Sequence, residues 1–314
     1  MRQVIGIGET VLDIIFRDDQ PISALPGGST FNAIVSLGRS GVSTRFISET
    51  GNDRVGRLIT TFLEQNGCPA SNVCVYPDSK SPLSLAFLNE HNDADYVFYK
   101  DHPNDRLEFV CPDIQPNDIV LFGSYYALNP VIRTQVKDFL DYAHQQGAIL
   151  YYDVNFRASH QNEAMRLRAN LLENFELADI VRGSSEDFEI LFRKTDASAI
   201  YRSEIMFYTH RFIYTHAAEP VELFSDGGFH KQYPVPPVET VSTIGAGDNF
   251  NAGLLYGLIR DGITREQLEQ GLTEQQWDRL ISCGQQFSAE VCSSLQNYVS
   301  PTFGQARRRE YVEH

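Results

Sequence analysis

Short apolar runs alternate with amphipathic stretches along most of the chain. The runs have the length of strands and predict buried strands at 4–8, 44–47, 119–122, 148–152, 180–181 and 212–214. Between them, apolar residues recur at helical spacing and predict helices over 53–65, 130–146, 163–175, 186–193, 248–260 and 277–295. Repeated strand–helix units indicate an α/β fold, with a mainly parallel sheet and helices on both of its faces.

Two segments depart from this alternation. In 82–100, apolar residues occupy every second position around a polar tip at 89–93, which predicts a hairpin. Another apolar run covers 11–16 and contains Asp13. Because no repeat, low-complexity tract or linker divides the chain, we expect one domain over 1–314 with a small β excursion.

Composition and charge exclude several classes of protein. The 314 residues carry 26 basic and 41 acidic side chains, a net charge of −15, whereas a nucleic-acid binder needs a basic surface to neutralise phosphates. The same excess of acid argues against a protein that binds membrane surfaces through Lys and Arg. No apolar run approaches the roughly 18 residues of a membrane span, and glycines break the N-terminal run too early for a signal peptide. The five cysteines are odd in number and contain no C-x-x-C pair, so we expect free thiols and a cytoplasmic location.

Three loops that follow predicted strands carry the candidate chemistry, because ligands of parallel sheets bind beyond the carboxyl ends of the strands. Gly245-Ala246-Gly247-Asp248 opens a helix. Such a glycine-rich turn presents backbone N–H groups to an anion, and the aspartate behind it could accept a proton from a hydroxyl. The alternative is a plain turn in which Asp248 caps the helix. The loop is not a Walker A motif, since no Gly-Lys-Ser/Thr follows.

The other two loops are 26–32 and 153–157. In the first, Ser29 or Thr30 is expected to cap the next helix, and Asn32 is a polar residue in an apolar stretch, as Asp13 is. Both have the alternative of a cap or a satisfied core group. In the second loop, aspartate, asparagine and arginine alternate and suit polyhydroxyl and phosphate groups; the alternative is a solvated loop.

Three other features are assigned no chemistry. Gly6-Ile7-Gly8 has Val11 where a dinucleotide fingerprint needs its third glycine, which makes a dehydrogenase a remote alternative. No histidine cluster has metal-ligand spacing. The basic run Arg307-Arg308-Arg309 is expected to be a solvated tail.

Taken together, these motifs resemble the ribokinase-like (PfkB-type) carbohydrate kinase family, in particular its fructokinase-like members. The resemblance spans almost the whole chain and includes a three-layer α/β/α fold. Five segments carry it: Gly6–Asp13, Pro26–Asn32, the G-x-D-x-x-G segment at 51–56, the D-x-N-x-R segment at 153–157 and Thr243–Phe250. The β excursion, about 11–26 and 82–102, then resembles the family's β lid, which covers the sugar and often dimerises.

The resemblance implies a role for each of these positions. Asp13, Gly27, Gly28 and Asn32 would bind the sugar, and Asn155 and Arg157 would lie near its reacting end. Asp248 would be the catalytic base, with the Gly245, Ala246 and Gly247 amides as the anion hole. ATP would be bound by Ser184, Thr215, Thr243, Gly245 and Gly247, and Mg²⁺ by Glu186 and Asp187.

The chain also departs from the family pattern. The usual aspartate is replaced by Ser242, which leaves activation by K⁺ open. The N-x-x-E segment appears as Ser184-Ser185-Glu186-Asp187, and the T-x-G-x-x-G segment that follows Thr215 has lost both glycines. We therefore expect a reshaped nucleotide pocket.

The sequence predicts an ATP-dependent kinase that phosphorylates a primary hydroxyl of a small sugar, with fructose first and ribose, ketodeoxygluconate or a nucleoside as alternatives. A catalytically weak sugar-binding regulator is a second alternative, motivated by the altered nucleotide and magnesium segments. The expected partners are a sugar, a nucleotide and, through the lid, a second copy of the chain.

Overall fold

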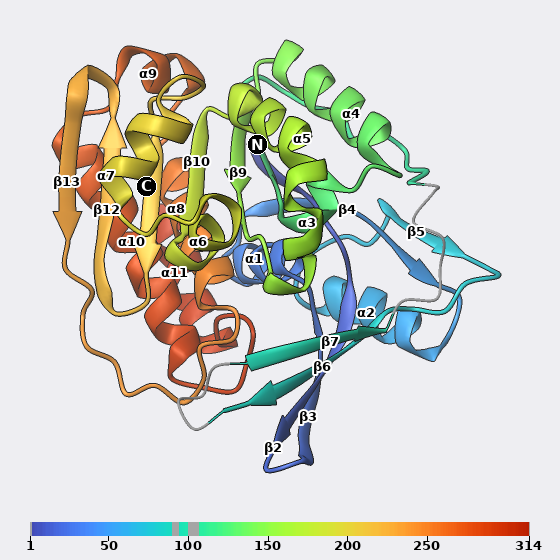
Figure 1. Cartoon of the computed structure of the whole chain (residues 1–314). Coiled ribbons are helices and arrows are strands. Elements are labelled where there is room, and N and C mark those ends of the chain that lie inside the picture. The colour runs from blue at the N-terminus through green and yellow to red at the C-terminus, as the bar shows by residue number, and fades with distance from the viewer. Residues whose placement is uncertain (1, 90–93, 100–106, 314) are drawn as a thin grey trace. The chain divides into compact units, whose positions relative to one another are not determined.

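The computed structural model describes residues 2–89, 94–99 and 107–313, which form two compact units (Figure 1). The first unit consists of Met1–Pro112, Val238–Gly262 and Asp278–His314. The second consists of Asp113–Pro237 and Ile263–Trp277. Each unit is described by itself below.

The first unit contains three parallel strands and the helices that pack on them. β1 (Gln3–Ile7) pairs with β4 (Ser43–Gly51), and β4 pairs with β5 (Val73–Tyr76). The helices are α1 (Ser29–Arg39), α2 (Arg54–Gln65), α8 (Ala246–Arg260), α10 (Glu274–Cys292), most of which lies here, and α11 (Pro301–Glu313). Residues 248–259 of α8 are all buried, and a side chain at Gly253 would collide with the Cys283 carbonyl of α10. The two helices are therefore in close contact.

A second, four-stranded sheet in this unit has the order β3-β2-β6-β7 and is called the lid sheet below. It contains β2 (Val11–Arg17), β3 (Gln20–Gly27), β6 (Leu83–Leu88) and β7 (Ala94–Tyr99). β6 and β7 pair antiparallel, which confirms the predicted hairpin, although residues 90–93 of its tip and 100–102 of the predicted lid lie outside the described residues. The inner face of the sheet packs on Ile244, which joins Ile15 and Ala86 in one apolar cluster.

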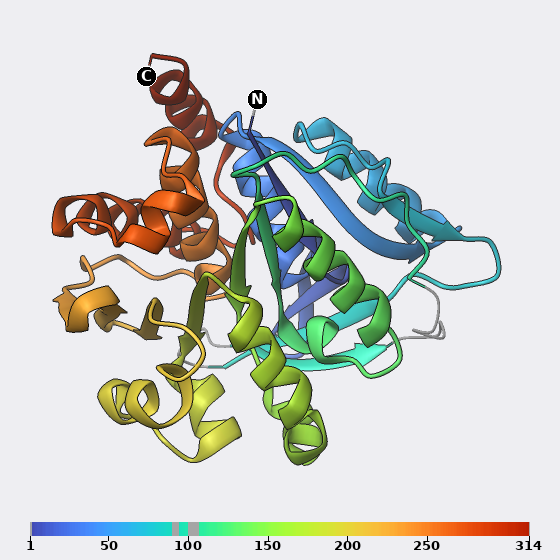
Figure 2. The same cartoon turned by 90° about the horizontal axis from the view of Figure 1, so that it is seen from above.

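The second unit has four parallel strands, followed by an antiparallel pair. β8 (Ile119–Gly123), β9 (Ile149–Asp153), β10 (Ile180–Ser184) and β11 (Phe212–His216) are parallel. β12 (Glu219–Ser225) and β13 (Phe229–Tyr233) extend them antiparallel. The helices are α3 (Ser124–Leu128), α4 (Arg133–Gln145), α5 (Ala164–Leu177), α6 (Ser185–Phe192), α7 (Ala197–Ile200) and α9 (Arg265–Gln270), together with the short segments η1 (Ala158–Glu163), η2 (Tyr201–Ile205) and η3 (Asp226–Gly228). α4 and α5 lie side by side (green, Figures 1 and 2).

Two local predictions are wrong. The Arg307–Arg309 run belongs to α11, where Arg307 pairs with Glu310 and the Tyr256 hydroxyl donates to the Arg307 carbonyl, so the run is helical and not a tail, although Arg308 and Arg309 are exposed to solvent as predicted. Neither Ser29 nor Thr30 caps α1. Its N-cap is Gly28, and the Thr30 hydroxyl donates to the Ile7 carbonyl of β1 instead.

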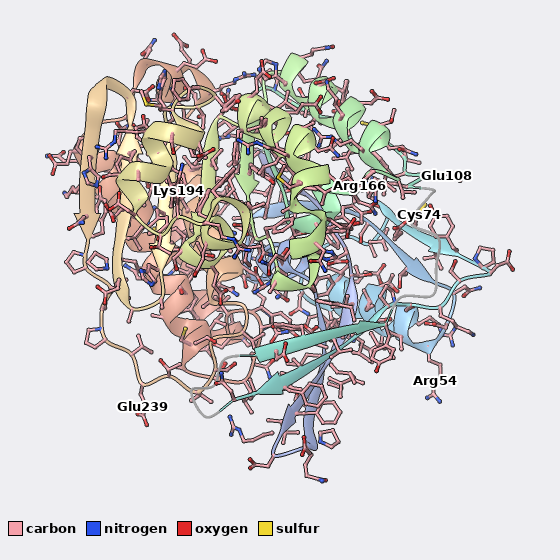
Figure 3. All side chains as sticks on the ribbon, viewed as in Figure 1. Arg54, Cys74, Glu108, Arg166, Lys194 and Glu239 are labelled. Atoms are coloured by element: carbon pink, nitrogen blue, oxygen red, sulfur yellow. The ribbon has the colours of Figure 1, made fainter. Side chains whose placement is uncertain are left out.

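The prediction of free thiols is confirmed, since all five cysteines are unpaired. Cys74 of β5 donates its S–H to the carbonyl of Glu108, and both residues are labelled in Figure 3. Among the described residues, no helix combines the length and the apolar character that crossing a membrane would require.

The cap of α2 gives a test of the fold. Asp53 precedes Arg54, which is labelled in Figure 3, and its carboxylate accepts the Gly56 N–H at 2.8 Å and both the N–H and the hydroxyl of Ser81. Burial raises the pKa of Asp53, but these hydrogen bonds outweigh it and hold the pKa below its ordinary value of 3.8. The stability that the carboxylate supplies is therefore complete above pH 3.8 and is lost as the pH falls below that value.

We expect Asp53→Ala to lower the free energy of unfolding by about 0.5–2 kcal/mol at pH 7, the usual range for a lost N-cap. Urea denaturation measures this, and Asp78→Ala, which removes an exposed carboxylate nearby, is the control. The difference from wild type should shrink as the pH approaches 3. A variant as stable as wild type at pH 7 would contradict the proposed cap.

Candidate active site

The Gly-Ala-Gly segment begins α8 with a tight turn. The Ala246 N–H donates to the Thr243 carbonyl at 3.1 Å, and Gly245 has φ 76° and ψ 0°, the angles that the third residue of a type II turn requires. Glycine adopts this left-handed conformation without strain. A side chain at Gly245 would also lie 2.6 Å from the carbonyl oxygen of Asn297. Both the conformation and the close contact therefore require glycine at this position.

The amino end of α8 is suited to an anion, although two amides of the predicted hole are better placed than the third. The Ala246 N–H is engaged by Thr243. Among the described residues, neither the Gly245 nor the Gly247 N–H donates a hydrogen bond. These two donors, at the positive end of a helix of 15 residues, form a natural site for a negatively charged group.

Asp248 lies in the first turn of α8 and is 7% exposed. Its Oδ2 accepts a hydrogen bond of 2.8 Å from Nδ2 of Asn32, in the first turn of α1. Two residues that are 216 positions apart in the sequence are thus in direct contact. Because Asn32 fixes the carboxylate from outside the helix, Asp248 does more than the capping alternative requires.

The same amide leaves one atom without a partner. The Oδ1 of Asn32 is buried and accepts no hydrogen bond from any described residue. A buried acceptor of this kind costs free energy unless a donor reaches it. A hydroxyl group of a bound ligand is a donor of the right kind.

Asp13 lies in β2, is 5% exposed, and accepts two side-chain hydrogen bonds. The Ser84 hydroxyl of β6 donates to its Oδ1 at 2.5 Å, and Nδ2 of Asn297 donates to its Oδ2 at 2.9 Å. A side chain at Gly27 would collide with the Asp13 carboxyl group. The glycine thus makes the space that the carboxylate occupies. Each carboxylate oxygen can accept a further hydrogen bond, so Asp13 retains capacity for ligand hydroxyls.

In the second unit, a buried ion pair joins the carboxyl ends of three strands. Nη1 of Arg182 in β10 lies 3.0 Å from Oδ1 of Asp153 in β9, and Nη2 donates to the Thr215 hydroxyl of β11 at 2.6 Å. Burial lowers the pKa of Arg182, but the charges of Asp153 and Asp187 raise it by more. The net effect is a raised pKa, so the guanidinium stays charged. Asp153 is therefore a buried, paired group and not part of a solvated loop.

Asp187, a predicted magnesium ligand, is held by backbone groups. Its Oδ2 accepts the N–H and hydroxyl of Ser184 in a capping box that begins α6, and its Oδ1 accepts the Phe156 N–H at 2.7 Å. Burial first, and then the charge of Asp153, raise its pKa. Both oxygens of Asp187 thus already accept hydrogen bonds from the protein, whereas Glu186, on the same turn, is exposed. Their role as magnesium ligands stays a prediction.

Three further predicted positions lie in the second unit: Asn155, Arg157 and the segment that follows Thr215. Asn155 has φ 35°, a conformation that asparagine tolerates better than most residues, and Arg157 is exposed. After Thr215, the chain turns back through Ala217, with φ 44°, so that His216 faces Glu219. A two-residue hairpin turn thus stands where the family pattern has its first glycine, and the position of the second, Pro220, lies in β12. Among the described residues, no group of three or more potential ligands could hold a metal ion.

Sequence reasoning missed three polar residues that connect the site of the first unit. Asn249 donates from Nδ2 to the carbonyls of Gly245 and Asn297, each at 2.8 Å, and accepts the Ser36 hydroxyl at Oδ1. Ser36 lies one helical turn after Asn32, so both face α8. For Ser36 the signal was present, since it is a polar residue in an apolar stretch, as Asp13 and Asn32 are, whereas Asn297 follows the polar residues Ser293, Ser294 and Gln296 and gave no such signal.

Comparison with known proteins identifies the family. The model of the pfkB family carbohydrate kinases matches residues 1–300. Among curated relatives, the 5-dehydro-2-deoxygluconokinase of Geobacillus kaustophilus is 27% identical over 264 residues, which cover 78% of this chain and 76% of the relative. Fructokinase-1 of Zea mays is 24% identical over 272 residues and covers 82% and 83% of the two chains.

Solved structures show the fold. The fructokinase of Vibrio cholerae O395, with fructose, ADP and a calcium ion bound, has a TM-score of 0.85 at 20% identity, over 98% of each chain. The aminoimidazole riboside kinase of Salmonella enterica, with its riboside and an ATP analogue, has a TM-score of 0.79 at 21% identity, over 99% of this chain and 100% of the other. The predicted α/β, ribokinase-like fold is therefore confirmed. The chain belongs to the pfkB family of carbohydrate kinases, phosphotransferases that act on a sugar hydroxyl.

Proposed function

We propose that the protein transfers the γ-phosphoryl group of ATP to a primary hydroxyl of a small sugar, with Asp248 as the base. The observation that carries this proposal is the buried Asp248 carboxylate, held by Asn32 three residues after the turn at Gly245. A fixed carboxylate beside a helix amino terminus combines a proton acceptor with an anion site.

In this mechanism, Asp248 accepts the proton of the attacking hydroxyl. The hydroxyl oxygen forms a bond to the γ-phosphorus while the bond to the leaving oxygen breaks, and ADP carries away the electron pair of that bond. The Gly245 and Gly247 amides stabilise negative charge on the transferred group. The Ala246 amide contributes less, because Thr243 already accepts its hydrogen bond.

The sugar is held by groups of the first unit. The carboxylate of Asp13 accepts hydroxyl groups, and Oδ1 of Asn32 accepts one more. Gly27 leaves the space that the Asp13 carboxylate occupies, and Gly28 lies against the Glu9 carbonyl, so direct contact of either glycine with the sugar remains a prediction. Asn155 and Arg157, which the family resemblance assigns to the reacting end of the sugar, remain predictions.

We favour fructose or a closely related keto sugar as the acceptor. The D-x-N-x-R segment and the fructokinase relatives support a neutral ketose, while the 5-dehydro-2-deoxygluconokinase relative keeps a sugar acid as the second candidate. The net charge of −15 favours the neutral sugar, because an acidic substrate meets repulsion from the protein as a whole.

Mg²⁺ enters as part of the substrate, bound to the phosphates of ATP, and needs only one or two protein carboxylates or their bound waters. Glu186 is the more accessible candidate for that part, because it is exposed, whereas Asp187 is buried and already holds backbone donors on both oxygens. Binding of the nucleotide by Ser184, Thr215 and Thr243, and pairing of lid sheets in a homodimer, remain predictions.

An assay of ADP release with ATP and Mg²⁺ tests the function against fructose, ribose, ketodeoxygluconate, 5-dehydro-2-deoxygluconate and nucleosides, with and without K⁺. We expect the fastest turnover on fructose or a keto sugar. Folded protein that turns over none of these compounds, and binds no ATP in calorimetry, would favour the sugar-binding regulator instead. The K⁺ dependence tests the effect of Ser242.

Removing the proposed base should separate binding from chemistry. We expect Asp248→Asn to reduce kcat by about 10³-fold or more, because no group remains to accept the proton. Binding of the sugar, measured by calorimetry, should stay within about threefold of wild type, since the amide keeps an acceptor for Asn32. Asp138→Asn, which removes an exposed carboxylate of α4, is the control. Turnover within tenfold of wild type would show that Asp248 is not the base.

The turn at Gly245 offers a second test. Gly245→Ala places a methyl group against the Asn297 carbonyl and at a positive φ, so we expect kcat/KM for ATP to fall by about 10²-fold. Gly262→Ala is the matched control: Gly262 also has a positive φ of 64°, but a methyl group there would meet no atom within 4 Å. Equal kinetics in the two variants would argue against an anion hole at this turn.

A further inference from the structure

We infer that Asn297 is a positioning residue, which orients Asp13 toward the sugar and links it to the anion-hole turn. The inference rests on the function proposed above. It comes from one juxtaposition: the side chain of Asn297 contacts the proposed sugar carboxylate, and its backbone carbonyl contacts the turn that begins α8.

The side chain acts on Asp13. Nδ2 of Asn297 donates to Oδ2 of Asp13 at 2.9 Å, across 284 residues of sequence, and Asn297 is completely buried. With Ser84 bound to Oδ1, each oxygen of Asp13 then has at least one donor fixed by the protein. These two donors set the plane of the carboxylate and hence the directions from which sugar hydroxyls can approach it.

The backbone of the same residue acts on the turn. The Asn297 carbonyl accepts Nδ2 of Asn249, which also donates to the Gly245 carbonyl. Two residues further on, the Val299 N–H donates to the Ser36 hydroxyl at 3.1 Å, and Ser36 in turn donates to Asn249. Asn297 is thus fixed to the amino end of α8 independently of its side chain.

Position 297 requires a side chain that donates a hydrogen bond, because the acceptor atom of the Asn297 amide makes no hydrogen bond with the described residues. Oδ1 of Asn297 is buried and accepts no hydrogen bond from any described residue. Such a buried acceptor without a partner destabilises the folded protein, which an apolar side chain of similar size would not do. The N–H that faces Asp13 is therefore the part of the side chain that has a function.

The charges around the contact between Asn297 and Asp13 make the substitution Asn297→Asp a useful test of the donor role. The Tyr298 hydroxyl interacts electrostatically with Asp13 on β2, and the Arg39 guanidinium of α1 lies over the Tyr298 ring. Asp248 lies in the first turn of α8, next to Asn249, which donates to the Asn297 carbonyl. In Asn297→Asp, two carboxylates would share the position of one hydrogen bond, and one of them would have to carry a proton. When the introduced acid carries that proton, it can donate to Asp13 as the amide does.

The test compares Asn297→Ala and Asn297→Asp with the wild type in the ADP-release assay, with the sugar that the wild type phosphorylates best. For Asn297→Ala we expect the sugar KM to rise about tenfold or more, as for loss of a hydrogen bond to a charged group, with the ATP KM within twofold. For Asn297→Asp we expect a sugar KM near that of wild type at pH 6 and at least tenfold higher at pH 8. Asn72→Ala, which removes another buried amide that donates to a carbonyl, is the control and should leave both KM values unchanged.

A purely structural role would lower the amount of active enzyme and so reduce kcat, without a selective change in the sugar KM or a new pH dependence. That result, in a variant shown to be folded by circular dichroism, would overturn the inference while leaving the proposed function intact. A folded wild type that phosphorylates no sugar would overturn both.

Discussion

The hydrogen bond between Asn32 and Asp248 is the contact on which the proposed site depends. It joins the first turns of α1 and α8, two helices separated by most of the chain, and holds a buried carboxylate at the positive end of α8. The contact needs both helices, because α1 supplies the Asn32 amide and α8 supplies the Asp248 carboxylate. Glycines at the two helix starts, Gly28 and Gly245, adopt the positive φ angles that let the preceding loops enter so closely.

A polar network in a mainly apolar interior is costly unless its members satisfy one another. In the first unit, most of these groups do: Ser36 and Asn249 bind each other, Asn249 binds two carbonyls, and Asn297 binds Asp13. The clear exceptions are the Oδ1 atoms of Asn32 and Asn297. In the proposed function, a ligand hydroxyl satisfies the first, and the donor at the opposite end of the amide accounts for the second. The network thus connects the proposed sugar-binding and phosphoryl-binding groups with one set of contacts.

The fold could be predicted because its signals are local. Alternating apolar runs and helical spacing revealed the parallel strands and the lid hairpin, and glycine-rich motifs revealed both helix starts. Other elements could not be predicted locally. The β2–β3 turn uses Asp18 and Asp19 at positive φ rather than the more usual Asn-Gly, and α11 contains a basic run whose partners, Tyr256 and Gln286, are distant in sequence. The capping box of Asp187 could not be read from the sequence for a related reason: a carboxylate at a helix start suits a cap and a metal equally, and its backbone donors are visible only in the structure.

The central claim is that a sugar hydroxyl lies against Asp248. The most direct measurement is a crystal structure of the protein with the sugar it phosphorylates best and a non-hydrolysable ATP analogue. The account predicts the acceptor hydroxyl within about 2.6–3.2 Å of the Asp248 carboxylate, with other hydroxyls on Asp13 and on Oδ1 of Asn32. A sugar whose acceptor hydroxyl points away from Asp248, with the γ-phosphate distant from the Gly245 and Gly247 amides, would contradict it.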